Sequence, residues 1–215
     1  MITENFQVPM TLSGEELDEY LARGWYRMGS FLFTTDYLFD IAHPVTWLRI
    51  DLSKVSYGSS QKKMRKKNSG FAIVIKPMAL SDEVDELFAL YKTQIDFIMQ
   101  SQSVQEYLHN LPDHNIFDTQ QIEVRDGGKL IGVGFFDLGS VSAAGIFNIY
   151  HPKYAQYSLG KYLMMVAVQY AIDSGRQWFY PGYIVEGMKK FDYKLFLDRN
   201  ATEKLDKVTD SWVAI

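Results

Sequence analysis

The sequence predicts an α+β protein in which helices flank a mixed sheet, with an α/β extension at the N-terminal end. Two observations carry this prediction. Apolar residues make up 47% of the 215 residues, which is ample for the core of one large or two small domains. From residue 81 onward, helical and strand patterns alternate, and a long apolar helix lies between strand patterns.

The first 77 residues predict a helix followed by strands. Residues 11–24 have Ser13 as an N-cap, acidic residues in the first turn and a glycine stop. Residues 25–34 and 45–52 are aromatic and β-branched, which is typical of strands. After a basic run that ends in a turn, residues 71–77 form a buried-strand pattern closed by a proline. We expect a soft boundary here, with an N-terminal module at 1–77 and a second domain at 78–215.

The second part begins with a helical pattern over 81–99, followed by a polar stretch that we expect to hold a short helix. Two strands then flank Asp126-Gly127-Gly128, a hairpin signal. Further predicted elements are a strand at 144–152, a helix at 157–173, a strand at 177–183, a short helix or turn, and a last strand. This order is that of the GNAT acyltransferase fold, in which a helix follows the central strand and its N-terminus faces the ligand.

Composition excludes several classes of function. The net charge is −4, so nucleic acid is not attracted by the chain as a whole, and any such contact needs a local patch. No cysteine is present, which excludes disulfides, thiolate metal sites and a cysteine nucleophile. The four histidines lack metal-ligand spacing, and we predict neither a metal nor a cofactor. Without a signal-peptide pattern or an apolar run of about 20 residues, we expect a soluble cytoplasmic protein with no membrane or DNA partner.

The stretch Ser158-Leu159-Gly160 opens the long apolar helix. Free N–H groups at a helix start bind anions, and glycine lets a ligand approach the backbone closely. The alternative interpretation of Gly160 is tight packing of the helix on a strand. The coenzyme A motif of GNAT enzymes is not matched, because Tyr157 and Tyr162 occupy its first and last positions. Acetyl-CoA is therefore not favoured as the donor.

Three stretches together resemble the bacterial leucyl- and arginyl-tRNA–protein transferases. They are "YLARGWYRMGSFLF" at 20–33, "SYGSSQKKMRKKNSG" at 56–70, and a set that runs from Asp137 through "YHP", "SLGKY" and "PGYIVEGMKKFDYK" to Lys194. The elements follow the family's order along most of the chain. The resemblance implies a GNAT-like aminoacyltransferase of the N-degron pathway. Its donor is a tRNA charged with Arg or Leu, and its acceptor is the N-terminal Asp or Glu of a protein.

The sequence departs from that family in two places. The family's cysteine cluster is missing from residues 34–47. The family's Tyr/Phe-Asp-Pro motif reads Tyr150-His151-Pro152, and a family serine and tyrosine fall on Ala144 and Phe147. A relative that binds tRNA or N-termini without turnover thus stays an alternative, as does a GNAT N-acyltransferase that uses acyl-CoA.

The basic run concentrates charge in an acidic chain: Lys62, Lys63, Arg65, Lys66 and Lys67. Phosphate neutralisation gives affinity for RNA, and with the family resemblance we predict a tRNA site here, to which Asn68 adds a hydrogen bond. A solvated charged loop is the alternative. Trp25, Tyr26 and Trp47 are candidates for stacking on unpaired bases, but aromatic residues are more often core, and Trp47 is predicted to be core.

Three residues are predicted to act in catalysis. Asp137 ends a strand, where a carboxylate can hold the donor amino group or the acceptor amine, or else cap a turn. Glu186 is predicted to be the base that neutralises or orients the amine, and Tyr183 to donate a hydroxyl to the leaving 3′ oxygen. Additional predicted ligands of the substrates are Ser158 and Gly160 at the helix start. Lys189 and Lys194, after Glu186, are predicted to meet either the terminal phosphates of the tRNA or the acidic side chain of the acceptor, and Lys194 ranks first because it matches a lysine of the family. Each of these has a structural alternative as a cap, core or surface residue.

Overall fold

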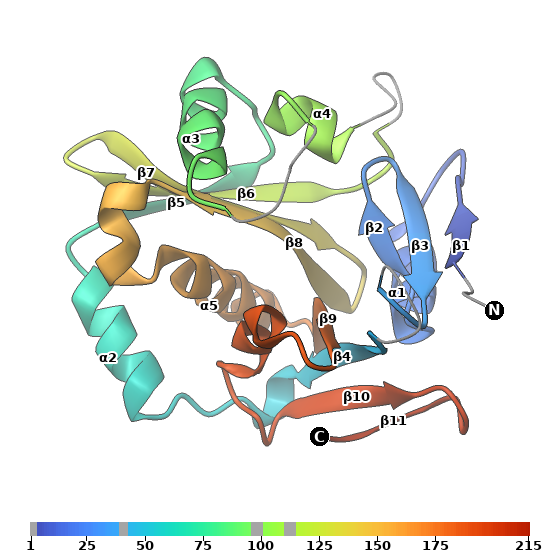
Figure 1. Ribbon diagram of the computed structural model, residues 1–215. Coiled ribbons are helices and arrows are strands. Elements are labelled where there is room, and N and C mark those ends of the chain that lie inside the picture. Colours follow the sequence, from blue (N-terminus) through green and yellow to red (C-terminus); the bar gives the residue numbers. More distant parts are fainter. Residues whose placement is uncertain (1–3, 39–42, 96–100, 110–114) are drawn as a thin grey trace.

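A computed structural model describes residues 4–38, 43–95, 101–109 and 115–215. An eight-stranded sheet has the order β11-β10-β4-β9-β8-β7-β6-β5, and a three-stranded sheet has the order β1-β3-β2 (Figure 1). All neighbouring strands are antiparallel except β8 and β9, which are parallel. The predicted α+β, GNAT-like mixed sheet flanked by helices is therefore confirmed. In the described ranges, no helix has the length and apolar character needed to cross a membrane.

The large sheet consists of β4 Val45–Asp51, β5 Ala72–Pro77, β6 Thr119–Asp126, β7 Lys129–Leu138, β8 Ser142–Tyr150, β9 Trp178–Val185, β10 Thr202–Asp206 and β11 Ser211–Ala214. The small sheet consists of β1 Glu4–Gln7, β2 Tyr26–Met28 and β3 Phe31–Thr35. Since β4 and β5 precede residue 77 and the other six strands follow it, the division that we predict there runs through one sheet. The division of the chain into two domains at residue 77 stays a prediction.

The α-helices are α1 Gly14–Ala22, α2 Ser59–Asn68, α3 Asp82–Lys92, α4 Val104–Leu108 and α5 Leu159–Asp173, and the 3₁₀ segments are η1 Leu52–Lys54, η2 Pro152–Tyr157 and η3 Lys189–Leu195. Ser13 and Glu16 form the capping box of α1, with both reciprocal hydrogen bonds present. The hairpin prediction is confirmed as well, because Gly127 and Gly128 have positive φ angles of 54° and 91° between β6 and β7. The helix predicted over 81–99 is shorter in the structure, because α3 ends at Lys92, and residues 96–99 of that prediction lie outside the described residues.

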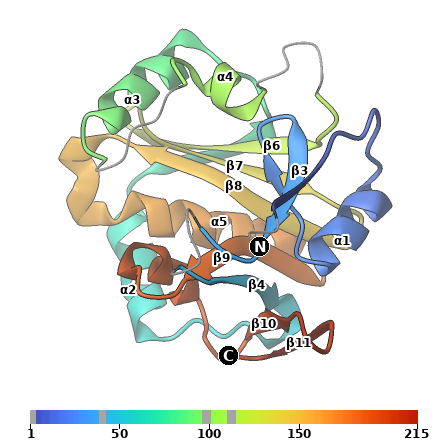
Figure 2. The same ribbon diagram turned by 45° about the vertical axis from the view of Figure 1, so that its right-hand side comes forward.

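Helices cover both faces of the large sheet (Figure 2). On one face α5 buries an apolar cluster that includes Leu163, Val168 and Phe179. On the other face α3 and α4 pack against β7 and β8 through Phe88, Leu108 and neighbouring side chains. A third cluster joins α1, the small sheet, β4 and β9, and Trp47 lies within it, 2% exposed. The prediction that Trp47 is core is confirmed.

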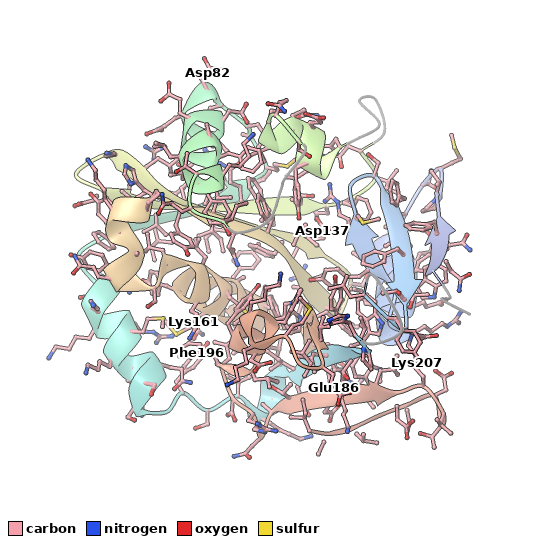
Figure 3. All side chains as sticks on the ribbon, viewed as in Figure 1. Asp82, Asp137, Lys161, Glu186, Phe196 and Lys207 are labelled. Carbon is pink, nitrogen blue, oxygen red and sulfur yellow. The ribbon has the colours of Figure 1, made fainter. Side chains whose placement is uncertain are left out.

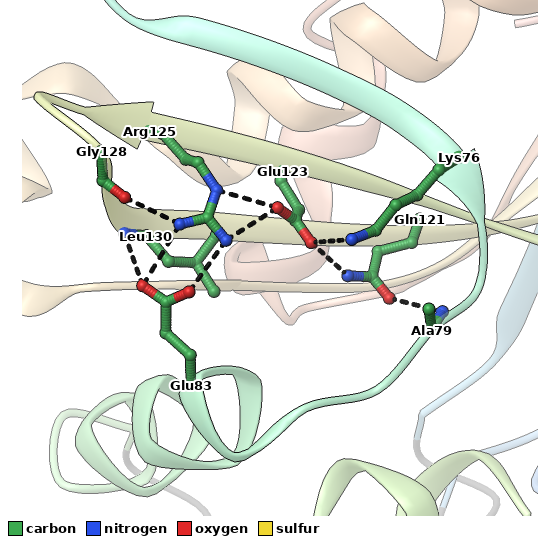
Figure 4. A network of polar contacts seen from close by, with 8 residues as sticks. All are labelled: Lys76, Ala79, Glu83, Gln121, Glu123, Arg125, Gly128 and Leu130. Atoms are coloured by element: carbon green, nitrogen blue, oxygen red, sulfur yellow. Dashed lines mark hydrogen bonds and ion pairs between the residues drawn. The ribbon is translucent and has the colours of Figure 1, made fainter.

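A polar network fastens α3 to the edge of the sheet (Figure 4). Glu123 accepts a hydrogen bond from Gln121 at 2.8 Å and pairs with Lys76 at 2.6 Å and Arg125 at 2.9 Å. Arg125 then reaches Glu83 at 2.8 Å. These side chains satisfy one another, so the network fixes the position of α3 over β6.

Candidate functional site

The parallel strands β8 and β9 separate after a short stretch of pairing. They pair only at Ser142–Trp178, Ala143–Phe179 and Ala144–Tyr180. Beyond these positions they no longer pair with each other, although β8 stays paired with β7 and β9 with β4. The register between β7 and β8 also shifts after Phe147, which leaves Ile146 as an extra residue in β8. Such a bulge bends a strand and leaves one residue out of the ladder. We call the space between residues 145–150 and 181–185 the β8/β9 wedge.

Tyr26 of β2 closes the narrow end of the wedge. Its hydroxyl donates to the carbonyl oxygen of Tyr180 at 3.0 Å and contacts the carbonyl oxygen of Gly145, so it bridges the two strands. Burial raises the pKa of Tyr26 well above its usual value, and the charge of Asp137 adds to the effect. The phenol therefore stays protonated. Because Tyr26 is 8% exposed and packs on Trp47, it is a core residue and not available to stack on a base, which decides between the two alternatives for this side chain.

Lys194 of η3 lies over the β9 side of the wedge. It is 9% exposed, and its Nζ atom donates to the carbonyl oxygen of Tyr183. Gly182 lies beside it, with a φ of +91° that favours glycine; a Cβ atom there would be in ordinary van der Waals contact, 3.5 Å from the Lys194 Nζ and 3.7 Å from the Tyr26 ring. Burial lowers the pKa of Lys194 to about 7. Lys194 is therefore a buried amine at the wedge, whereas Lys189 of the same segment is exposed.

Tyrosine side chains surround this amine. Burial raises the pKa values of Tyr107, Tyr183 and Tyr193, so at neutral pH all three are hydrogen-bond donors. Tyr107 stacks on Phe147 of the wedge with ring centroids 4.2 Å apart. Tyr193 is 40% exposed even though protein surrounds enough of it to raise its pKa. Tyr193 is therefore partly exposed to solvent, while Lys194 beside it is buried.

Asp137 is not the free carboxylate that its place at a strand end suggested. It is 1% exposed, and its Oδ1 atom accepts hydrogen bonds from Arg27 at 2.8 Å and Thr119 at 2.6 Å. Burial raises its pKa, against the effects of Arg27 and Thr119. The same guanidinium donates to the Leu108 carbonyl at 2.7 Å, so the pair ties β2, α4 and β7 together. The geometry gives Asp137 a structural task, and its role toward substrate stays a prediction.

His109 borders this ion pair. Both of its ring nitrogens are buried, and neither has a hydrogen-bond partner in the described part of the chain. Burial, helped by the charge of Arg27, lowers its pKa to about 4, so the ring is neutral at physiological pH. Sequence reasoning gave no role to Arg27 or His109, because residues so distant in sequence carry no local signal of their contact.

The predicted tRNA site is a helix rather than a loop. Helix α2 packs on α5 and η2, and its exposed cations are Lys62, Lys63, Arg65, Lys66 and Lys67. Arg65 donates to Gln169 and Lys67 to the Gln156 carbonyl. Among the described residues, no ion pair or hydrogen bond engages the side-chain ammonium groups of Lys62, Lys63 or Lys66.

Asn68 differs from the prediction. It is buried, and its Nδ2 atom donates to the carbonyl oxygens of Met64 at 2.9 Å and Tyr157 at 3.1 Å. It therefore fastens α2 to the segment before α5 and does not present its amide to a ligand. Gln61, about two turns earlier, donates to the Leu197 carbonyl at 2.9 Å. As a result α2 is fixed both to the start of α5 and to the chain after η3.

Ser158 and Gly160 form the entry to α5, as predicted. Ser158 adopts the left-handed conformation with φ 54°. Its side chain makes no cap hydrogen bond, so it does not satisfy any N–H group of the first turn of α5. A Cβ atom on Gly160 would lie 3.3 Å from the Tyr150 ring, so the glycine allows close packing of α5 on the end of β8. The packing interpretation of Gly160 has direct support here, and its contact with a ligand stays a prediction.

Glu186 lies apart from Asp137 and Lys194. It follows β9, where its N–H donates to the Pro44 carbonyl at 3.0 Å, and its side chain is exposed. Together with Lys189 it lines a shallow cavity of about 450 Å³ between β4 and η3, which neither Asp137 nor Lys194 lines. Figure 3 shows Asp137 and Glu186 at separate positions of the sheet. The structure thus brings Tyr183 and Lys194 together at the wedge and leaves Glu186 and Lys189 beside it.

Comparisons with known proteins agree with this geometry. Residues 83–200 match the model of the family "Arginine-tRNA-protein transferase, C terminus". An aspartate/glutamate leucyltransferase of Leptospira interrogans is 26% identical over 89% of this chain and 75% of its own length. One of Aeromonas hydrophila is 30% identical over 68% of this chain and 62% of its own. The crystal structure of FemX shares the fold, with a TM-score of 0.50 and 11% identity over 81% of this chain and 61% of that one. The family match covers more than half of the residues, and the chain belongs to the arginine-tRNA-protein transferase family.

Proposed function

We propose that this protein transfers an aminoacyl group, leucyl in the first instance, from a charged tRNA to the N-terminal Asp or Glu of a protein. The names of the relatives support the donor and the acceptor. The composition of the wedge supports leucine over arginine. Its described walls carry aromatic rings such as Tyr107, Phe147 and Tyr183, while the neighbouring carboxylate of Asp137 is already paired with Arg27. An apolar side chain packs against rings; a guanidinium also stacks on rings, but the Asp137 carboxylate that could pair with it here is already engaged by Arg27.

Helix α2 is the proposed contact for the tRNA acceptor end. The wedge opens in the direction in which β8 runs toward η2 and the start of α5, and α2 is fastened to that same segment (Figure 1). The unengaged lysines of α2 therefore lie at the open end of the wedge. Lysine ammonium groups there neutralise backbone phosphates and hold the tRNA, while the 3′ end carries the aminoacyl ester inward.

Within the wedge the acceptor amine attacks the ester carbonyl. A C–N bond forms, the C–O bond to the ribose breaks, and the proton lost by the amine ends on the released 3′ oxygen. The ester is already activated, so holding the two substrates side by side supplies much of the rate. We propose that tyrosine hydroxyls such as that of Tyr183, which burial keeps protonated, donate to the carbonyl or the leaving oxygen. Glu186 stays the proposed group that orients the amine from the rim.

The observation that carries this proposal is the parallel strand pair that separates beside a fixed basic helix. A transfer assay tests it: leucyl-, arginyl- and phenylalanyl-tRNA with labelled amino acids, peptides that start with Asp, Glu or Ala, and acetyl-CoA in parallel. We expect label from leucyl-tRNA on the acidic peptides. Label from acetyl-CoA alone supports an ordinary N-acetyltransferase, and tRNA binding without transfer supports a non-catalytic relative.

A further inference from the structure

Lys194 is a buried cation without an anionic partner. In the described part of the chain its ammonium has one hydrogen-bond acceptor, the Tyr183 carbonyl, and no carboxylate within ion-pair distance. Aromatic rings stand around it, with the Nζ atom 4.7 Å from the centroid of Tyr183, 5.1 Å from that of Phe191 and 5.9 Å from that of Tyr193. Ring faces attract a cation, but they compensate only part of the hydration that burial removes.

Gly182 and Tyr193 lie beside this ammonium. Gly182 contributes no side chain there, and Tyr193, whose ring centroid is 5.9 Å from the Nζ atom, is partly exposed to solvent. The other ionisable groups near the wedge do not form an ion pair with Lys194. Asp137 is paired with Arg27. Burial keeps four phenols protonated and therefore uncharged: Tyr26, Tyr107, Tyr183 and Tyr193. A bound anion would therefore pair with the Lys194 ammonium, the one charge in this described cluster that has no oppositely charged partner.

We infer that Lys194 reads the acidic side chain of the acceptor, by pairing its ammonium with the carboxylate of an N-terminal aspartate or glutamate. The inference rests on the proposed function and names the residue that sets its acceptor specificity. The side chain of Asp or Glu carries its carboxylate on one or two methylene groups, so it is slim enough to approach a buried ammonium. A tRNA phosphate carries its ribose on both sides and suits the exposed lysines of α2.

The lowered pKa of Lys194 gives this contact a measurable signature. At pH 8 the free amine is mostly neutral, because burial places its pKa at about 7. A carboxylate brought against it favours the charged form, so binding of an acidic N-terminus draws a proton from the buffer. A residue that merely supports the fold takes up no proton when a peptide binds.

The experiment is calorimetric binding of two peptides that differ only in Asp or Asn at the first position, at pH 8 and in buffers of different ionisation enthalpy. The proteins are the wild type, Lys194→Met and, as a matched exposed lysine on β10, Lys204→Met. We expect the wild type and Lys204→Met to bind the Asp peptide about 100-fold more tightly than the Asn peptide, with uptake of close to one proton more. We expect Lys194→Met to lose both differences.

The outcome of the peptide-binding experiment tests the role of Lys194 independently of the transfer assay. Equal binding of the two peptides by the wild type, or an unchanged preference in Lys194→Met, overturns the inference even if transfer occurs. A preference for Asp that disappears in Lys194→Met upholds the inference even if no charged tRNA supports transfer, in which case only the proposed reaction fails. If Lys194→Met instead weakens tRNA binding and keeps the peptide preference, the ammonium serves a phosphate and the inference is wrong.

Discussion

The buried amine of Lys194 makes the stability of the free protein depend on pH. The ordinary pKa of a lysine is 10.5, and burial lowers that of Lys194 to about 7 in the folded state. Between these values the unfolded chain binds a proton that the folded chain does not bind. Stability therefore rises as the pH rises through this window, and the contribution is complete only above the unfolded pKa.

The magnitude follows from the two pKa values. Each pKa unit corresponds to about 1.4 kcal/mol, so the free energy of unfolding should rise by about 2–3 kcal/mol between pH 7.5 and pH 9.5 because of this one group. Lys194→Met keeps most of the side-chain volume and removes the charge. We expect this variant to be at least as stable as the wild type at pH 7.5, with the difference shrinking toward pH 9.5.

Urea unfolding of the wild type, Lys194→Met and Lys204→Met at pH 7.5, 8.5 and 9.5 measures this effect. Tyrosines with raised pKa values titrate mainly above this range, and their effect is common to all three proteins. The wild type and Lys204→Met should gain stability in parallel, and Lys194→Met should stay nearly level. If Lys194→Met gains stability with the same slope as the wild type, the ammonium is not destabilised by burial and the reasoning fails.

Three further predictions concern other parts of the molecule. Asp137→Asn leaves the Arg27 guanidinium buried without its counter-charge and should cost about 3–5 kcal/mol in urea unfolding, and a cost below about 1 kcal/mol would contradict a structural role for the pair. Replacing Lys62, Lys63 and Lys66 of α2 by alanine should weaken tRNA binding and reduce the slope of log affinity against log salt concentration by about 2. An unchanged slope would show that α2 does not contact the tRNA. Gly182→Ala places a Cβ atom at φ +91° beside Lys194 and should cost more than about 1 kcal/mol, measured by thermal unfolding, and an unchanged melting temperature would show that the backbone adapts.

Local signals predicted the elements on which the site rests. The capping box of α1, the glycine pair between β6 and β7 and the apolar run of α5 are all short-range patterns, and the structure has these elements where the sequence placed them. The basic run was recognised as an unusual concentration of charge. That it forms a helix fastened through Asn68 depends on contacts with Tyr157, which lies 89 residues away, and no local pattern reports that contact.

Long-range contacts also decide what the charged residues do. Asp137 and Arg27 are separated by 110 positions, so the sequence did not indicate that the carboxylate is already paired. Lys194 follows two exposed lysines in one short segment, and only the fold distinguishes the buried member from the others. The separation of β8 from β9 likewise depends on the bulge and on Tyr26, which comes from a strand far earlier in the chain.

The transfer of labelled leucine from leucyl-tRNA to a peptide with N-terminal Asp, compared with the same peptide starting with Asn, tests the central claim most directly. The account predicts label on the Asp peptide, little on the Asn peptide, and loss of this preference in Lys194→Met but not in Lys204→Met. Equal labelling of both peptides by the wild type, or label from acetyl-CoA and none from any charged tRNA, would contradict it.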